Sequence, residues 1–448
     1  MAIKDDTGSV IPDGGGEWQG GTGSLAQRIT GGMRVQCPRR VLLVAIAMVT
    51  CAGCATPPAE VGRTADTERM DAQDRAAASG GGAAEGGAAE GGSAEGGSAA
   101  GGEAAAGRTQ GGAAMGHDAG GQPDVSAADP LHECQQVTGL ALGPGGALVS
   151  GELAASAAFT QCLPSWNVDS TEPFTVELRT RPQGSSLWTP WLLIGDWGIA
   201  QRSEEVVTAC DEARVAVDVL EASTPLDRAQ LRFTPGGASP LSPEAVRAFV
   251  IFTDERLLEQ RVAAASAEPW PLPVELSVPA RSQRAAGEDI GHRICSPTSV
   301  AMVAAYHGRR VPTRTMAATV LDPHFDIYGN WNRAVQGAFS HGVPGRLVRL
   351  SSWASVAEYL AAGRPLVASI RAAPGELRGA PYEKTAGHLL VITGLGLGGV
   401  VYVNDPAAAW PGVVPRRYMR ADMEQVWFRN GGVAYALEAP KALRGETL

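Results

Sequence analysis

Positions 295–302 of the 448-residue chain read Cys295-Ser296-Pro297-Thr298-Ser299-Val300-Ala301-Met302. The proline and the small residues after it predict a helix from Pro297 to about His307, because proline is favoured in the first helical turn, where its missing N–H costs nothing. The Cys295 thiol is then expected at a helix N-terminus, where backbone N–H groups and the helix dipole favour an anion. That position lowers the pKa of a thiol and makes it a nucleophile. Taken alone, the segment is equally compatible with a buried structural cysteine.

Two apolar segments further along the chain predict a β-hairpin. The first runs over residues 385–394 and the second over residues 400–406, with a glycine-rich turn between them. Apolar runs joined by such a turn are typical of a hairpin. His388 opens the first strand and Asp405 closes the second, so antiparallel pairing is expected to bring both side chains to the same end. A histidine held by a carboxylate and facing a cysteine at a helix N-terminus is the arrangement of a cysteine peptidase.

Three segments in this order resemble motifs of cysteine peptidase family thirty-nine: residues 295–299, 387–389 and 403–406. That family holds the bacteriocin-leader (double-glycine) peptidases and many secreted relatives with a papain-like fold. The resemblance covers about residues 275–440. It implies an α+β papain-like cysteine peptidase domain, which we place at residues 271–448.

The resemblance also implies the site residues. Cys295 would be the nucleophile, His388 the general base and acid, and Asp405 the residue that orients the imidazole. Asn404 is the alternative for the third role, but adjacent strand residues point to opposite faces, so only one of the two can face His388; we favour Asp405. Family members carry a glutamine upstream of the cysteine that binds the developing oxyanion. Gln283 is the only glutamine in the segment leading into Cys295, and its assignment depends on an insertion before the helix.

The amino-terminal 54 residues predict export. Arg39 and Arg40 precede a short apolar run over residues 41–50, followed by the small residues 51–54, and this order is typical of a secretory signal. The last three residues resemble the end of a bacterial lipobox, which predicts lipidation of Cys54 and a membrane anchor. The alternative is an ordinary signal peptide cut nearby. Either way, we expect an exported protein, a cell-envelope lipoprotein or a secreted one.

Residues 55–130 are expected to form a disordered tether. A Gly/Ala/Glu unit repeats with a five-residue period from Gly81 to about Gly101. Such a segment lacks the large apolar residues that offset chain entropy on folding. The formal net charge of the chain is −10, which argues against nucleic acid as a partner.

Residues 131–270 predict a separate β-sandwich domain, because short alternating or apolar runs recur between Pro and Gly turns. These runs cover residues 174–179, 214–219, 230–233 and 246–253. The region also holds four tryptophans, Trp166, Trp188, Trp191 and Trp197, for which both stacking on sugars and core packing stay open.

Cysteine usage completes the prediction. One disulfide is expected within the β region of an exported protein, either Cys134–Cys162 or Cys162–Cys210. The sequence has no spaced cluster of Cys and His ligands, so no metal or cofactor is predicted.

We therefore expect an exported cysteine peptidase that hydrolyses peptide bonds of a peptide or protein substrate through a thioester intermediate. The chain contains no transporter segment or P-loop, which argues against leader removal. The alternatives are an envelope acyl transferase or amidase on the same triad, and a non-catalytic envelope binding protein.

Overall fold

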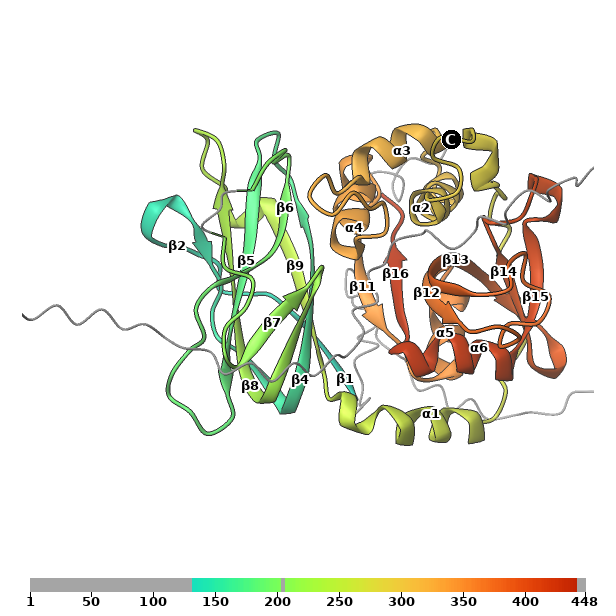
Figure 1. The fold of residues 1–448 in the computed structure, drawn as a ribbon, viewed down its shortest axis with the longest axis horizontal. Coiled ribbons are helices and arrows are strands. Elements are labelled where there is room, and N and C mark those ends of the chain that lie inside the picture. The colour runs from blue at the N-terminus through green and yellow to red at the C-terminus, as the bar shows by residue number, and fades with distance from the viewer. Residues whose placement is uncertain (1–130, 203–205, 441–448) are drawn as a thin grey trace, which may run out of the picture. The chain divides into compact units, whose positions relative to one another are not determined.

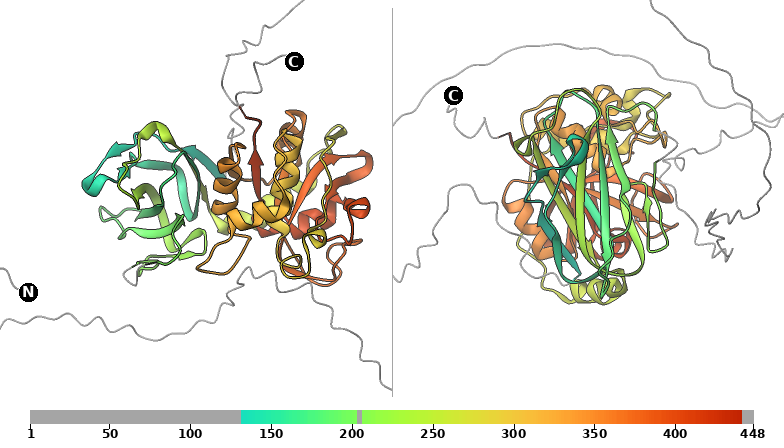
Figure 2. Two further views of the ribbon diagram at one scale, coloured as in Figure 1. Left: turned by 90° about the horizontal axis from the view of Figure 1, so that it is seen from above. Right: turned by 90° about the vertical axis from the view of Figure 1, so that its left-hand side faces the viewer.

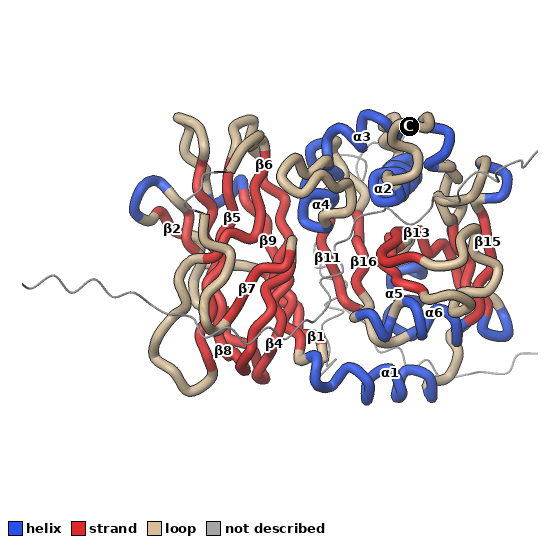
Figure 3. The backbone as a smooth tube through the Cα atoms, in the orientation of Figure 1, coloured by secondary structure: helices blue, strands red, loops and turns tan. Residues whose placement is uncertain are grey.

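The computed structural model describes residues 131–202 and 206–440. The predicted signal segment with Cys54 and the predicted tether lie outside the described residues. Figures 1 and 2 show the described elements as ribbons, and Figure 3 distinguishes helices from strands.

Residues 131–253 form an antiparallel sheet of nine strands among the described residues. Six of them follow one another in the order β1-β9-β4-β8-β3-β2, β5 and β7 pair with β8, and β6 pairs with β5. The strands are β1 (His132–Gln136), β2 (Ala141–Leu142), β3 (Leu148–Val149), β4 (Leu153–Val168), β5 (Phe174–Pro182), β6 (Leu192–Trp197), β7 (Ala213–Ala216), β8 (Val219–Pro235) and β9 (Val246–Thr253).

Side-chain alternation along these strands builds a core. In β5, Phe174, Val176 and Leu178 are fully buried, whereas the residues between them are half-buried, as the two-residue period of a strand requires. One predicted run was wrong in part. Residues 214–219 do not form a single strand, because Val217 has a φ of 61° and turns the chain between β7 and β8.

Residues 258–437 combine six helices with an antiparallel sheet of seven strands, whose main order is β11-β16-β12-β13-β14-β15, with β10 beside β13. The strands are β10 (Val274–Glu275), β11 (Gly345–Arg349), β12 (Leu366–Ala372), β13 (Thr385–Leu395), β14 (Val400–Asn404), β15 (Pro415–Met419) and β16 (Val433–Leu437). The helices are α1 (Leu258–Ala267), α2 (Cys295–Tyr306), α3 (Thr313–Val320), α4 (Trp331–Ser340), α5 (Trp353–Ala361) and α6 (Arg420–Val426).

Strand β13 separates two hydrophobic cores. Leu389 and Val391 point into the core that contains α2, α3 and α4. Leu390 and Ile392 point into the core that contains α1, α5 and α6. Successive residues of a strand face opposite sides of the sheet, so this sheet is covered by helices on both faces, as Figure 3 shows for α2 and α5. The arrangement agrees with the expected α+β class.

The edge strand β11 is covered by side chains of β4. Ser165 Oγ accepts a 3.1 Å hydrogen bond from the Leu347 N–H, and Asn167 Oδ1 accepts a 3.0 Å bond from the Gly345 N–H. Edge strands expose backbone groups that need partners. The polar residues of β4 therefore satisfy backbone donors of the second sheet.

Candidate active site

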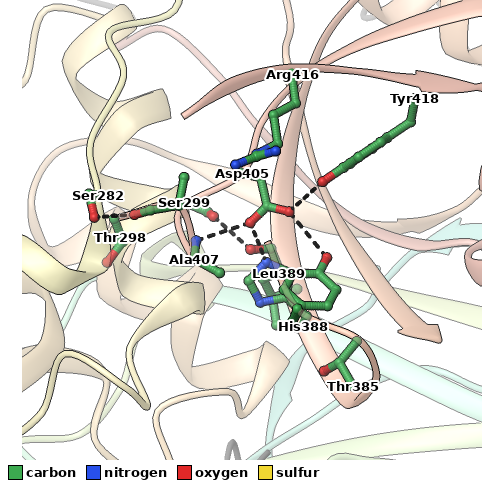
Figure 4. Close-up of polar contacts among 12 residues, drawn as sticks. Ser282, Thr298, Ser299, Thr385, His388, Leu389, Asp405, Ala407, Arg416 and Tyr418 are labelled. Atoms are coloured by element: carbon green, nitrogen blue, oxygen red, sulfur yellow. Dashed lines mark hydrogen bonds and ion pairs between the residues drawn. The ribbon is translucent and has the colours of Figure 1, made fainter. Parts of the chain in front are cut away.

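The nucleophile candidate Cys295 is the first residue of α2, two residues before the predicted start of the helix. Only 2% of its surface is exposed. Every residue of α2 through Ala304 is buried, so α2 is a core helix that is enclosed on all sides. One turn into the helix, Ser299 Oγ donates a 3.1 Å hydrogen bond to the carbonyl oxygen of Leu389 (Figure 4). This bond joins the helix of Cys295 to the strand of His388.

The hairpin that presents His388 and Asp405 has the predicted form. Strands β13 and β14 pair antiparallel, with Val391 opposite Asn404. Gly394 is required there, because a Cβ at this position would lie 2.5 Å from the Val274 carbonyl oxygen. His388 is the fourth residue of β13 rather than its first, and Asp405 directly follows β14.

His388 and Asp405 form a buried pair. His388 Nε2 lies 2.8 Å from Asp405 Oδ1, as drawn in Figure 4. Burial lowers the pKa of His388, but the charge of Asp405, the hydrogen bond with Asp405 and the hydrogen bond with Cys295 raise it, to about 10 overall. Since Nε2 is directed at Asp405, Nδ1 is the ring nitrogen left for the thiol. The raised pKa favours a protonated His388, an imidazolium beside the Asp405 carboxylate.

Asp405 receives four hydrogen bonds. Oδ1 accepts from His388 and, at 3.0 Å, from the Ala407 N–H. Oδ2 accepts from Tyr418 Oη at 2.8 Å and from Tyr382 Oη at 3.1 Å. Burial raises the pKa of Asp405, but the charge of His388 and these hydrogen bonds outweigh burial and hold the pKa below its usual value. A carboxylate that accepts several bonds stays ionised although it is buried.

The structure does not bring Asn404 to His388. Its Nδ2 donates a 3.0 Å hydrogen bond to the carbonyl oxygen of Val278. Strand alternation therefore separates the two candidates for the third role, as expected.

Gln283 begins a short 3-10 helix over Gln283–Ala286 and is 2% exposed. Its N–H donates a 2.8 Å bond to the Pro406 carbonyl oxygen, and Ser282 Oγ donates a 2.6 Å bond to that of Ala408. The segment is thus attached to the loop that follows Asp405. Among the described residues, the buried Gln283 Oε1 has no hydrogen-bond partner.

Sequence reasoning did not identify Tyr382 and Tyr418 as partners of Asp405. Tyr418 lies on β15, and Tyr382 lies in the loop between β12 and β13. The Tyr382 ring also packs edge-on against the His388 ring, with centroids 4.9 Å apart. Both tyrosines reach Asp405 through tertiary packing, which the spacing of residues in the sequence does not predict.

The predicted disulfide is wrong in both forms, since none of the four cysteines in the described part of the chain is disulfide-bonded. Strand order explains the absence. β9 lies between the strands of Cys134 and Cys162, and β8 lies between β4 and the β7 hairpin that Cys210 precedes. Strands two positions apart are about 10 Å from one another, which is too far for a disulfide.

The region that carries this site is similar to a known family. Residues 275–435 match the family described as Peptidase_C39 like family. This match supports a cysteine-type peptidase. Residues 96–239 match a second family, described as Peptidase C39 N-terminal domain. The resemblance inferred from the three motifs is confirmed at the level of the family.

A solved structure described as a double glycine motif protease from an AMS/PCAT transporter, in complex with the leader peptide, is similar to part of this chain. It shares 18% sequence identity over 37% of this chain and 97% of that chain, with a TM-score of 0.25. No curated protein matches the chain. Within residues 131–202 and 206–440, no helix has the length and apolar character needed to cross a membrane.

Proposed function

We propose that the chain is an exported cysteine peptidase in which Cys295, His388 and Asp405 hydrolyse peptide bonds. The observation that carries this proposal is the buried 2.8 Å contact between His388 Nε2 and Asp405 Oδ1, with Cys295 as the second hydrogen-bond partner of His388. This is the order of nucleophile, base and orienting carboxylate that thiol catalysis requires.

In the first step, the Cys295 thiolate attacks the carbonyl carbon of the substrate, and the carbonyl electrons move to oxygen. The His388 imidazolium then gives its proton to the leaving amine, the C–N bond breaks, and a thioester forms. His388, now neutral, takes a proton from water, which attacks the thioester and releases the acid and the thiolate. Asp405 remains ionised throughout and holds the imidazole in place.

Gln283 is the proposed donor to the oxyanion. Its backbone is attached to Pro406, and its side-chain amide carries two N–H donors. One such donor lowers the barrier by about 3 kcal/mol. The tyrosine pair, Tyr382 and Tyr418, positions Asp405.

We also propose that the protein is exported and anchored through a lipidated Cys54, because the basic pair, apolar run and small residues at positions 39–54 resemble a lipoprotein signal. Mass spectrometry of the amino terminus from a membrane fraction tests this. A lipidated peptide beginning at Cys54 supports the anchor, and an unmodified cut elsewhere refutes it.

The peptidase proposal is tested by the rate at which iodoacetamide alkylates Cys295 between pH 5 and 10. An ion pair with His388 keeps the rate high well below the pKa of about 8.5 of an ordinary thiol. The Cys295→Ala variant identifies the labelled site. A rate that rises about tenfold per pH unit up to about pH 8.5 would show an ordinary thiol and refute the nucleophile.

A further inference from the structure

The outer face of β5 and β8 carries a stack of alternating arginine and tryptophan side chains. None of these residues takes part in the proposed chemistry. The Arg179 guanidinium lies 4.8 Å from the ring centre of Trp188 and 4.6 Å from that of Trp191. Arg232 lies 4.7 Å from Trp191, and Arg181 lies 5.8 Å from Trp188. The order is therefore Arg181, Trp188, Arg179, Trp191, Arg232.

This stack shows how two of the four tryptophans, Trp188 and Trp191, are packed. Trp166 is buried in the core. Two guanidinium groups lie over the Trp191 ring, so a sugar would have to displace one of them to stack there. Neither sugar stacking nor simple core packing describes Trp188 and Trp191.

The arginines at one end of the stack keep hydrogen-bonding capacity. Arg179 directs Nε and Nη2 to the amide oxygen of Gln230, with Nε at 2.9 Å. Arg232 directs Nε and Nη2 to the carboxylate of Glu177, both at 2.6 Å. Within residues 131–202 and 206–440, neither arginine uses Nη1 for a hydrogen bond to the groups named above, and Arg179 has no carboxylate within ion-pair distance. Arg181, in contrast, pairs with Asp227 at 3.2 Å.

A pocket of about 480 Å³ opens at this end. Its walls combine the two guanidinium groups and one indole with small and apolar side chains of the β2–β3 hairpin. The residues are Arg179, Trp191, Arg232, Gly139, Ala141, Leu142, Gly143, Pro144, Val149 and Ser150. Leu142 at this pocket is 69% exposed.

We propose that this pocket binds an acidic peptide segment through a glutamate or aspartate side chain. The carboxylate would accept hydrogen bonds from Nη1 of Arg179 and Arg232, since arginine recognises carboxylates through several N–H donors. The apolar stem of the residue would pack against Trp191 and Val149. The charge favours such a ligand, because the described pocket lining holds two guanidinium groups and no carboxylate. Of the carboxylates near these arginines, Glu177 forms an ion pair with Arg232, and the charge of Glu152 acts on Arg179 without an ion pair among the described residues.

The test uses the full chain with Cys295→Ala, so that binding is measured without cleavage and independently of the proposed peptidase activity. The probe is the blocked peptide Gly-Ala-Glu-Glu-Ala-Gly, and the matched peptide carries glutamine in place of both glutamates. We expect the acidic peptide to quench tryptophan fluorescence and to release heat in calorimetry, with an affinity that falls as salt rises. The glutamine peptide is expected to bind at least tenfold more weakly.

Three variants locate the site. Arg179→Gln removes the guanidinium that, among the described residues, has no carboxylate partner, and it should weaken binding about tenfold. Leu142→Glu adds a negative charge at an exposed position on the pocket and should weaken binding similarly without touching the stack, so it keeps the test valid if Arg179→Gln misfolds. Arg181→Gln changes an arginine of the same stack that does not line the pocket, and should alter the affinity less than twofold.

Equal binding of both peptides, or an equal effect of Arg179→Gln and Arg181→Gln, would overturn the proposal. Tighter binding of single-stranded DNA than of the acidic peptide would also overturn it, because the pocket would then recognise phosphate.

Discussion

Ser299 and Leu389 are joined by a 3.1 Å hydrogen bond from the serine Oγ to the leucine carbonyl oxygen. Ser299 lies one turn after Cys295, and Leu389 directly follows His388. This bond therefore connects the helix that holds the nucleophile to the strand that holds the base. The relative position of thiol and imidazole therefore depends on a contact between residues ninety positions apart in the chain.

We expect Ser299→Ala to loosen this connection. The unfolding free energy should fall by about 1 kcal/mol, and the alkylation rate of Cys295 at pH 6 should fall several-fold, because the imidazole no longer holds one position. Thr298→Val is the control, since Thr298 Oγ1 bonds within its own helix to the Ile294 carbonyl oxygen. Equal alkylation rates in both variants would contradict the positioning role.

Asp405→Asn should abolish most of the thiol reactivity at pH 6. Burial lowers the pKa of His388, and only the Asp405 carboxylate and the bonded groups raise it to about 10. Without the carboxylate charge, the imidazole should become neutral and the alkylation rate should drop at least tenfold. Asn404→Ala is the matched control and should leave the rate within about twofold. A larger effect of Asn404→Ala would assign the orienting role to Asn404.

Tyr418→Phe and Tyr382→Phe each remove one donor to Asp405 Oδ2. Hydrogen bonds to an ionised group hold its pKa low, so the pKa of Asp405 should rise in both variants. The acid limb of the alkylation profile should then move to higher pH. Tyr359→Phe is the control, because it removes the hydroxyl of a buried tyrosine that contacts Arg346 instead of Asp405. An acid limb that stays in place in both site variants would exclude a positioning role for the tyrosine pair.

Gln283→Ala should separate oxyanion binding from thiol activation. The alkylation rate of Cys295 should change little, because alkylation develops no oxyanion. The affinity for a peptide aldehyde, whose adduct with the thiol carries that oxygen, should fall by about 10²-fold. Gln425→Ala is the control, because Gln425 contacts Glu376 instead. Unchanged aldehyde affinity would remove Gln283 from the site.

Stability should depend on pH through the buried pair. The pKa of His388 is raised, so its contribution is complete below about pH 6.5, the unfolded value, and is lost as the pH rises towards about 10. The pKa of Asp405 is lowered, so its contribution is complete above about pH 4 and is lost in acid. Urea unfolding should therefore show the largest difference between the native chain and Asp405→Asn between about pH 4 and 6.5. A difference that does not change from pH 5 to 10 would contradict this coupling.

Local sequence patterns were sufficient for the elements that carry the site. A proline in the first turn predicted the helix after Cys295, and a glycine-rich turn between apolar runs predicted the hairpin. The period of two along a strand also separated Asp405 from Asn404. Each of these features depends on residues close together in the chain, so the spacing of residues in the sequence is enough to predict it.

Strand order, by contrast, could not be read from the sequence. It separates Cys134 from Cys162 by β9 and thereby excludes the expected disulfide. The turn at Val217 divides a run that alternates like a single strand. Alternation identifies the buried face of a strand but not its neighbours or its exact ends.

The amino-acid sequence established the helix with its cysteine, the hairpin with its histidine and carboxylate, and the family to which they point. The tertiary structure alone decided which distant groups complete them: the two tyrosines on Asp405, the Ser299 bond to Leu389, and the arginine–tryptophan stack beside its pocket. These contacts join residues that no periodicity relates, because side chains from separate elements meet only when the sheets and helices pack.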